Sequence, residues 1–116
     1  LDYNRFIHEE HSVIDFILEY IHQHYAEDIT RTDLSDLVYL NPDYMARLFK
    51  KQTGKSIVNY ITDYRMQKAK ELLNSPDIPI GTVASKVGYG NYSYFSKLFK
   101  DITGLTPNEY RKKILQ

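Results

Sequence analysis

The chain has 116 residues, and its 15 Lys and Arg balance 15 Asp and Glu, so the formal net charge is zero. That length predicts one domain, or two very small ones, with a modest core, and the composition is that of an ordinary globular protein. No apolar run approaches ~18 residues, which excludes a transmembrane helix, and no signal peptide is visible. Cysteine is absent, which excludes disulfides, thiolate metal sites and thiol catalysis and favours a cytoplasmic protein.

The two kinds of charge are unevenly distributed along the chain. Residues 1–43 hold ten acids and two bases, a net charge of −8, whereas residues 44–116 hold thirteen bases and five acids, a net charge of +8. A zero average argues against a nucleic-acid binder, but a strongly basic half favours a polyanionic partner. An uneven solvated surface is the alternative interpretation, and charge by itself leaves both open.

The spacing of apolar residues predicts helices almost throughout and no strand. Ser12, with an acid three residues later, predicts the start of a first helix that runs to about Tyr25. Thr30 and Asp33 have the spacing of a capping box, which predicts a short second helix that ends near Tyr39.

The middle of the chain predicts two further helices. Asn41 followed by proline is an N-cap before a helix over 42–53, which Gly54 ends as a left-handed C-cap. Ser56 is the N-cap of a long fourth helix over 56–74. Three more helices follow, in the segments 80–87, 91–103 and 107–113, the last of them opened by a capping box at 106–109.

An internal repeat is the most specific feature of the sequence. A shift of 50 residues pairs positions of like chemistry, namely Tyr44 with Tyr94, Arg47 with Lys97, Leu48 with Leu98, Phe49 with Phe99, Lys50 with Lys100, Thr53 with Thr103, Gly54 with Gly104, Ser56 with Thr106 and Tyr60 with Tyr110. Upstream the best shift is 49, so the second copy has one extra residue near Asn91. Each copy is a short helix, a tight turn and a second helix, which is the helix-turn-helix plan.

The second helix of each copy has an apolar stripe and an opposite face of small or basic residues. The predicted stripes are Tyr44, Met45, Leu48 and Phe49 in the first copy and Tyr94, Phe95, Leu98, Phe99 and Ile102 in the second. Opposite them lie Asp43, Ala46, Arg47 and Lys50, and in the second copy Ser93, Ser96, Lys97 and Lys100. Such a face can enter a major groove, and its cations can release counterions from phosphates.

The segments 39–56 and 87–100, with the motifs at 65–73 and 103–111, resemble the DNA-binding domain of the AraC/XylS transcription regulators over residues 11–113. The resemblance implies an all-α fold of seven helices forming two helix-turn-helix subdomains joined by a long linker helix. The implied divisions are an interdomain linker end at 1–10, subdomains at 11–55 and 75–116, and the linker helix at 56–74. It also implies that recognition helices at about 42–53 and 91–103 enter successive major grooves of DNA.

The length of the linker helix agrees with that arrangement. About 19 residues at ~1.5 Å each span ~28 Å, whereas adjacent major-groove entries on one face of DNA lie ~34 Å apart. One long helix can therefore hold two reading heads at nearly that spacing.

The resemblance implies two groups of DNA contacts. The base-reading positions fall on Asp43, Ala46, Arg47, Asn91, Tyr92, Ser93, Ser96 and Lys97. The expected phosphate contacts are Lys50, Lys51 and Lys100, with the helix N-termini near Thr30 and Asn41.

Three of the base-reading positions have alternative interpretations. Ala46 is short and can touch at most a thymine methyl group, where many members of the family carry a longer polar side chain. Asp43 must read a cytosine amino group, pair locally or point away from the phosphates. Asn91 either reads bases or caps the following helix, because Gly90 stands where the family has a Ser-type cap.

No catalytic nucleophile–base pair or phosphate-binding glycine loop is present, so we expect neither enzyme activity nor a cofactor. His8 and His11 have helical spacing without further ligands, and we expect no metal. The chain begins with Leu1, and we expect a fragment of a bacterial regulator that has lost its N-terminal regulatory domain. The wording around residues 24–28 and 38–42 resembles regulators with a phosphoacceptor receiver, and a sugar-sensing domain is the alternative.

The expected partners are double-stranded DNA, the regulatory domain, RNA polymerase and a second copy in a full-length homodimer, with no membrane. A different class of function stays open. The acidic first 43 residues are consistent with a protein-interaction module that docks the regulatory domain or RNA polymerase.

Overall fold

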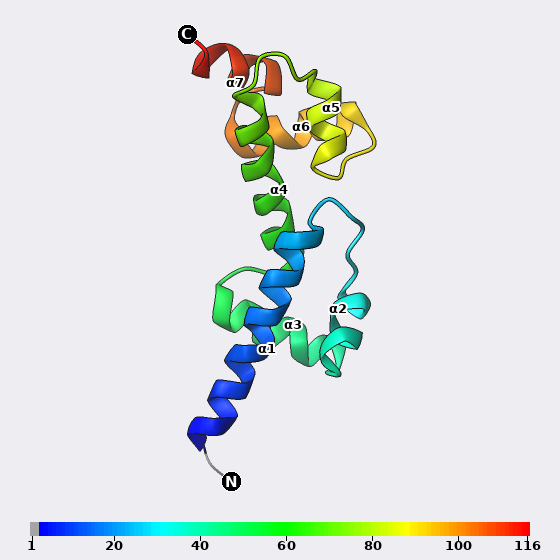
Figure 1. The fold of residues 1–116 in the computed structure, drawn as a ribbon, viewed down its shortest axis with the longest axis vertical. Coiled ribbons are helices and arrows are strands. Elements are labelled where there is room, and N and C mark those ends of the chain that lie inside the picture. The colour runs from blue at the N-terminus through cyan, green and yellow to red at the C-terminus, as the bar shows by residue number, and fades with distance from the viewer. Residues whose placement is uncertain (1–2) are drawn as a thin grey trace. The chain divides into compact units, whose positions relative to one another are not determined.

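The computed structural model of the protein describes residues 3–116, with side chains described from His11 onward. Seven helices and no strand make up this described part of the chain, which confirms the predicted all-α fold (Figure 1). They are α1 (Tyr3–His24), α2 (Arg31–Val38), α3 (Pro42–Thr53), α4 (Ile57–Leu73), α5 (Ile80–Lys86), α6 (Tyr92–Thr103) and α7 (Pro107–Ile114). None of these helices, as far as the chain is described, is long and apolar enough to cross a membrane.

The first helix begins earlier than the sequence predicts. α1 begins at Tyr3, so Ser12 lies inside the helix and is not its N-cap. The segment 3–11 contains no proline or glycine, the residues that most strongly oppose a helix. Nothing in it therefore prevents the helix from extending toward the N-terminus beyond Ser12. Residues 1–2 of the predicted interdomain linker lie outside the described residues, and residues 3–10 form the first turns of α1.

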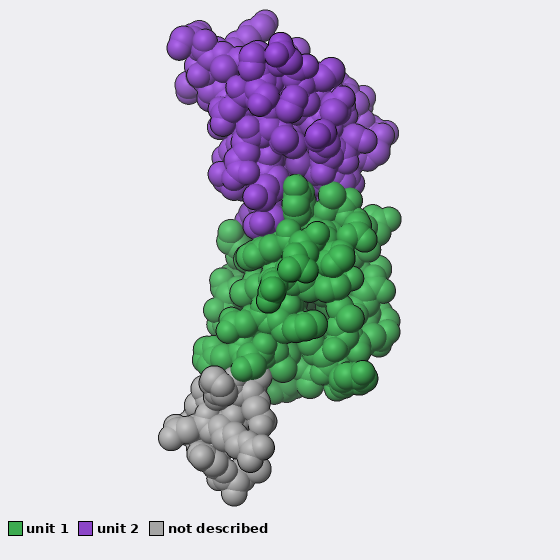
Figure 2. Space-filling model, viewed as in Figure 1, with its two compact units in different colours: residues 1–62 green, residues 63–116 purple. Residues whose placement is uncertain are grey.

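The chain divides into two compact units, residues 1–62 (unit 1) and 63–116 (unit 2), coloured separately in Figure 2. The division falls inside α4, so the first turns of this helix belong to unit 1 and the remainder belongs to unit 2. Ser56 begins the helix as predicted, since its hydroxyl accepts a hydrogen bond from the N–H of Asn59 at 3.1 Å.

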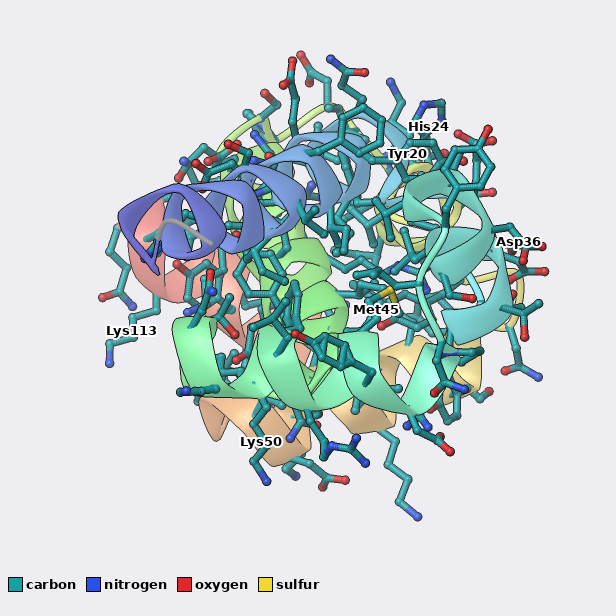
Figure 3. The ribbon with its side chains drawn as sticks, turned by 90° about the horizontal axis from the view of Figure 1, so that it is seen from below. Tyr20, His24, Asp36, Met45, Lys50 and Lys113 are labelled. Atoms are coloured by element: carbon teal, nitrogen blue, oxygen red, sulfur yellow. The ribbon has the colours of Figure 1, made fainter. Side chains whose placement is uncertain are left out.

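The core of unit 1 lies between α1, α2, α3 and the start of α4. Apolar residues recur along α1 at the spacing of one helical face, and the buried set is Ile14, Ile17, Ile21, Leu34, Met45, Leu48, Phe49, Ile57 and Ile61. Figure 3 shows Met45 pointing from α3 into this interior, whereas Lys50 points away from it. The hydroxyl of Tyr60 lies 2.7 Å from Nε2 of His22, which links the start of α4 to α1.

The core of unit 2 is built on α4, α5 and α6 around the buried residues Met66, Ala69, Leu73, Val83, Ala84, Val87, Phe95 and Phe99. Two residues of the predicted α6 stripe reach solvent: Tyr94, at one edge of the stripe, is 58% exposed, and Ile102, in the last turn, is 44% exposed. The buried stripe is thus narrower on one side and shorter at its end than predicted. The ring of Tyr94 packs at 5.9 Å from that of Tyr89, so an amphipathic side chain covers the edge of the core.

The two copies of the repeat end their second helices with the same hydrogen bonds. Thr53 and Thr103 each donate their hydroxyl to the carbonyl four residues earlier at 2.8 Å and accept the N–H two residues later at 3.2 Å. The glycine that follows is left-handed in both copies, with φ 81° at Gly54 and 87° at Gly104. This agreement confirms that the repeat in the sequence is a repeat of structure.

An aromatic pair then fixes the next helix against the end of the previous one in each copy. The rings of Phe49 and Tyr60 meet edge to face with centroids 5.6 Å apart, and those of Phe99 and Tyr110 do so at 5.5 Å. The two units therefore contain the same helix–turn–helix joint, each packed within its own core.

Both predicted capping boxes are present. Thr30 caps α2 with Asp33, and Thr106 caps α7 with Glu109, each by reciprocal side-chain and backbone hydrogen bonds. Hydrogen bonding to Thr30 lowers the pKa of Asp33, and the backbone N–H of Thr30 has a larger effect than its side chain. Thr106 lowers the pKa of Glu109 in the same way.

Candidate nucleic-acid interface

α3 begins with its own cap and presents a partly basic face to solvent. The Oδ1 atom of Asn41 accepts hydrogen bonds from the N–H groups of Asp43 and Tyr44 at 2.9 and 3.1 Å. Four predicted DNA contacts on this helix are exposed, Asp43, Arg47, Lys50 and Lys51, and Ala46 is half-buried. The face therefore offers three cations, one acid and one short apolar side chain, and its cations suit a surface that approaches DNA.

Asp43 pairs locally. Its Oδ1 accepts a hydrogen bond at 3.1 Å from a terminal nitrogen of Arg31, the first residue of α2. This resolves the alternatives for Asp43 in the free protein in favour of a local partner. Sequence reasoning did not single out Arg31, because nothing in its own helix marks it as part of the α3 face.

A groove of about 370 Å³ lies beside the outward face of α3 within unit 1. It is lined by Ile29, Arg31, Asp43, Ala46, Arg47, Lys50, Ser56, Ile57, Val58 and Ile61. Four of the predicted α3 contacts thus share one concave surface, and the fifth, Lys51, lines a smaller hollow to which Arg47 also contributes. Val58, in this lining, is 72% exposed, and nothing in the sequence distinguishes it from an ordinary surface valine.

In unit 2, α6 carries the second set of predicted contacts. Four of them are exposed, namely Tyr92, Ser93, Lys97 and Lys100, and Ser96 is half-buried. These side chains occupy one element, as the sequence predicts.

Three of the predicted contacts are also the N-caps of their helices. Oδ1 of Asn91 accepts the N–H of Tyr94 at 2.9 Å, so its alternative role as a cap is present in the structure. Thr30 and Asn41 likewise use their side-chain oxygens on their own helices. At the N-termini of α2 and α3 the groups that could face a phosphate are therefore first-turn backbone N–H groups.

These observations define the class of the protein as a helix-turn-helix domain with two units, each of which exposes a second helix that carries a cation at the matching position. A family model described as "Helix-turn-helix domain" matches residues 34–113. The chain belongs to this family, in its AraC type, whose members are DNA-binding domains of transcription regulators.

The chain is similar to the transcriptional regulatory protein YesN of Bacillus subtilis, with 41% identity over 80 residues that make up 67% of this chain and 22% of YesN. It is also similar to the C-terminal domain of the response regulator AraT of Geobacillus stearothermophilus, at 35% identity and a TM-score of 0.83, covering 87% of this chain and 84% of that domain. The DNA-binding domain of AdpA, solved with a target DNA, shares the fold at 21% identity and a TM-score of 0.80, covering 86% of this chain and 90% of that one.

The chain spans only part of its curated relatives, between 22% and 40% of the length of three of them. Most of these relatives are named as transcription regulators, and one, AdaA of Bacillus subtilis, is named as both an activator and a DNA repair enzyme. Nothing in these similarities supports the alternative of a protein-interaction module.

Proposed function

We propose that α3 and α6 each enter a major groove of double-stranded DNA and read base edges there. The observation that carries this proposal is that one joint is built twice, and each copy presents a cation at the same outward position, Arg47 in α3 and Lys97 in α6. A single exposed cationic side chain is an ordinary surface residue. The same cation at the same position of both repeats supports a ligand that offers two equivalent binding sites, and successive major grooves of DNA are such sites.

The side chains divide by the chemistry they offer. Arg47 can bind the O6 and N7 atoms of guanine through two parallel hydrogen bonds, and Ala46 can contact a thymine methyl group. On α6, Tyr92, Ser93, Ser96 and Lys97 are the proposed readers, with Asn91 limited by its role as a cap. The proposed phosphate contacts are Lys50, Lys51, Lys100 and the N-termini of α2 and α3.

For the whole protein we propose the output part of a bacterial transcription regulator that acts in the cytoplasm. Similarity to the C-terminal domain of AraT, a response regulator, favours a receiver as the regulatory domain. A homodimer would double the number of reading heads, and RNA polymerase is the proposed partner for activation.

The direct test begins with selection of bound sequences from random duplexes, which should return two short boxes about one helical turn apart. On the selected duplex, Arg47→Ala and Lys97→Ala should each weaken binding by ~1–3 kcal/mol and relax the preference at one position. Lys113→Ala, which removes an exposed base from α7, is the matched control and should leave the preference unchanged. Unchanged affinity for both α3 and α6 variants, in folded proteins, would contradict the proposal.

A further inference from the structure

The ion pair between Arg31 and Asp43 joins the first turns of two helices on the surface of unit 1. Arg31 begins α2, Asp43 lies in the first turn of α3, and their side chains are 57% and 76% exposed. An exposed ion pair of this kind contributes little to stability, because water and salt screen it. Its position beside the proposed reading face suggests a role in binding.

We propose that Asp43 is a positioning residue, which holds the guanidinium of Arg31 against the sugar-phosphate backbone of the DNA strand that borders α3. The inference rests on the proposed function and deepens it. It moves Asp43 from the base-reading group to a supporting one and adds Arg31 to the residues that contact DNA.

The donor geometry of arginine allows both contacts at once. A guanidinium carries several N–H donors in a rigid planar fork, and the bond to Oδ1 of Asp43 uses one of its terminal nitrogens. The remaining donors can reach a phosphate, and arginine suits phosphate oxygens because two parallel hydrogen bonds can form. The carboxylate meanwhile restricts the side chain to one orientation, which lowers the entropy lost on binding.

The groove beside α3 suits a nucleic-acid backbone by the charge and the apolar character of its lining. Its lining includes three cationic side chains, Arg31, Arg47 and Lys50, and one acid, Asp43. Part of its wall is apolar and includes Ile57 and the exposed Val58. The cations match the phosphates, and the apolar wall matches the carbon face of deoxyribose. Without Arg31, Asp43 would instead place an unpaired negative charge next to that backbone.

Binding of four proteins tests the proposal: the wild type, Arg31→Ala, Asp43→Asn and the double variant. Each is titrated over a salt series on the duplex selected by the wild type and on an unrelated duplex. Arg31→Ala should weaken binding to both duplexes and reduce the slope of log affinity against log salt by about 1. Asp43→Asn should weaken binding about threefold or more in the wild type, and it should tighten binding slightly when Arg31 is already absent, because it then only removes a negative charge beside the phosphates.

Several outcomes would overturn the proposal. If Asp43→Asn tightens binding in both backgrounds, the acid only repels phosphates. If it changes the preferred base at one position, Asp43 reads that base. An unchanged salt slope for Arg31→Ala would show that Arg31 does not touch DNA.

Two controls keep the result interpretable. Arg31→Lys retains the charge but loses the planar guanidinium with its paired donors. Compared with Arg31→Ala, it should therefore have the salt slope of the wild type but only part of the affinity of the wild type. Arg31→Ala leaves Asp43 and the cap of α3 intact, so it tests the proposal even if Asp43→Asn loosens α3. Failure of the proposed function itself would look different, since the wild type would then select no sequence and Arg47→Ala would change nothing.

Discussion

Tyr39 adopts a backbone conformation that residues other than glycine rarely adopt. It ends α2 with φ 57° and ψ 38°, in the left-handed region, and its side chain is 93% exposed. The second copy has Gly88 at the equivalent position, also with positive φ, at 102°. The same turn is therefore built once with glycine and once with a residue that pays a steric cost for its Cβ.

Replacing Tyr39 with asparagine should stabilise the protein by about 0.5–1 kcal/mol, because asparagine tolerates the left-handed region and loses no buried contact here. Urea denaturation of the two proteins measures the difference. Gly54→Ala is the matched opposite change: its Cβ would meet nothing within 4 Å, so the φ of 81° alone should destabilise the variant by about 1 kcal/mol. A less stable Tyr39→Asn would mean that the tyrosine ring contributes packing that its exposure does not suggest.

The candidate site was only partly predictable at this scale. Arg47 and Lys97 could be found because each is an exposed base at a repeated position of a periodic helix. The bond between Asp43 and Arg31 could not, since it joins residues from two helices and depends on the angle at which α2 meets α3. For Asn91 the missing serine before α6 predicts either a cap or a base contact, and the structure shows the cap.

Individual helices are governed mainly by their ends. The capping residues at Thr30, Asn41, Ser56 and Thr106 were all readable, because each is a side chain that satisfies N–H groups a few residues away. The start of α1 was not, because a Ser and an Asp at the right spacing also occur inside helices.

The two capping boxes should make folding sensitive to acid. In the folded protein the pKa values of Asp33 and Glu109 are lowered. Their contribution to the free energy of unfolding is therefore fully present above the pKa values of the unfolded chain, and it is lost as the pH falls through the pKa values of the folded protein. The difference in stability between the wild type and the Asp33→Asn/Glu109→Gln variant should therefore be largest above about pH 5 and shrink below about pH 4. Denaturation across pH 2–7 measures it, and a difference that does not depend on pH would contradict this account.

At the scale of the whole molecule, the zero net charge divides into an acidic first part and a basic second part. Figure 3 shows the contrast within unit 1, where Asp36 points outward from α2 and Lys50 points outward from α3. The acids Asp15 and Glu19 on α1 are exposed as well. If DNA approaches α3, these acids act on it only through a screened field.

Neutralising two of them, as Asp15→Asn/Glu19→Gln, should therefore change binding little. We expect non-specific affinity to rise by no more than about twofold, and the sequence preference to stay the same, because a repulsive field is removed and no contact is lost. Titration of an unrelated duplex and of the selected one checks both. A large loss of affinity would mean that DNA lies against α1.

The overall fold was predictable because the same pattern of helices, caps and turn occurs in both copies of the repeat. Agreement between the copies separated the positions that build the joint from those that only happen to be apolar. The depth of burial was harder to predict: Met66 is buried although the sequence analysis did not single it out, and Ile102 is exposed although its helical spacing predicts a buried position. Burial depends on which neighbouring helix covers a position, and that is a property of packing.

The matching joints of Thr53 and Thr103 have a consequence for how such a protein can evolve. None of the hydrogen bonds that form them uses the side chain of an outward residue of α3 or α6. A substitution on one of these faces therefore leaves the joints and the other face unchanged. Under the proposed function, one half of a DNA site can then change together with the helix face that reads it, by single steps that each keep the fold.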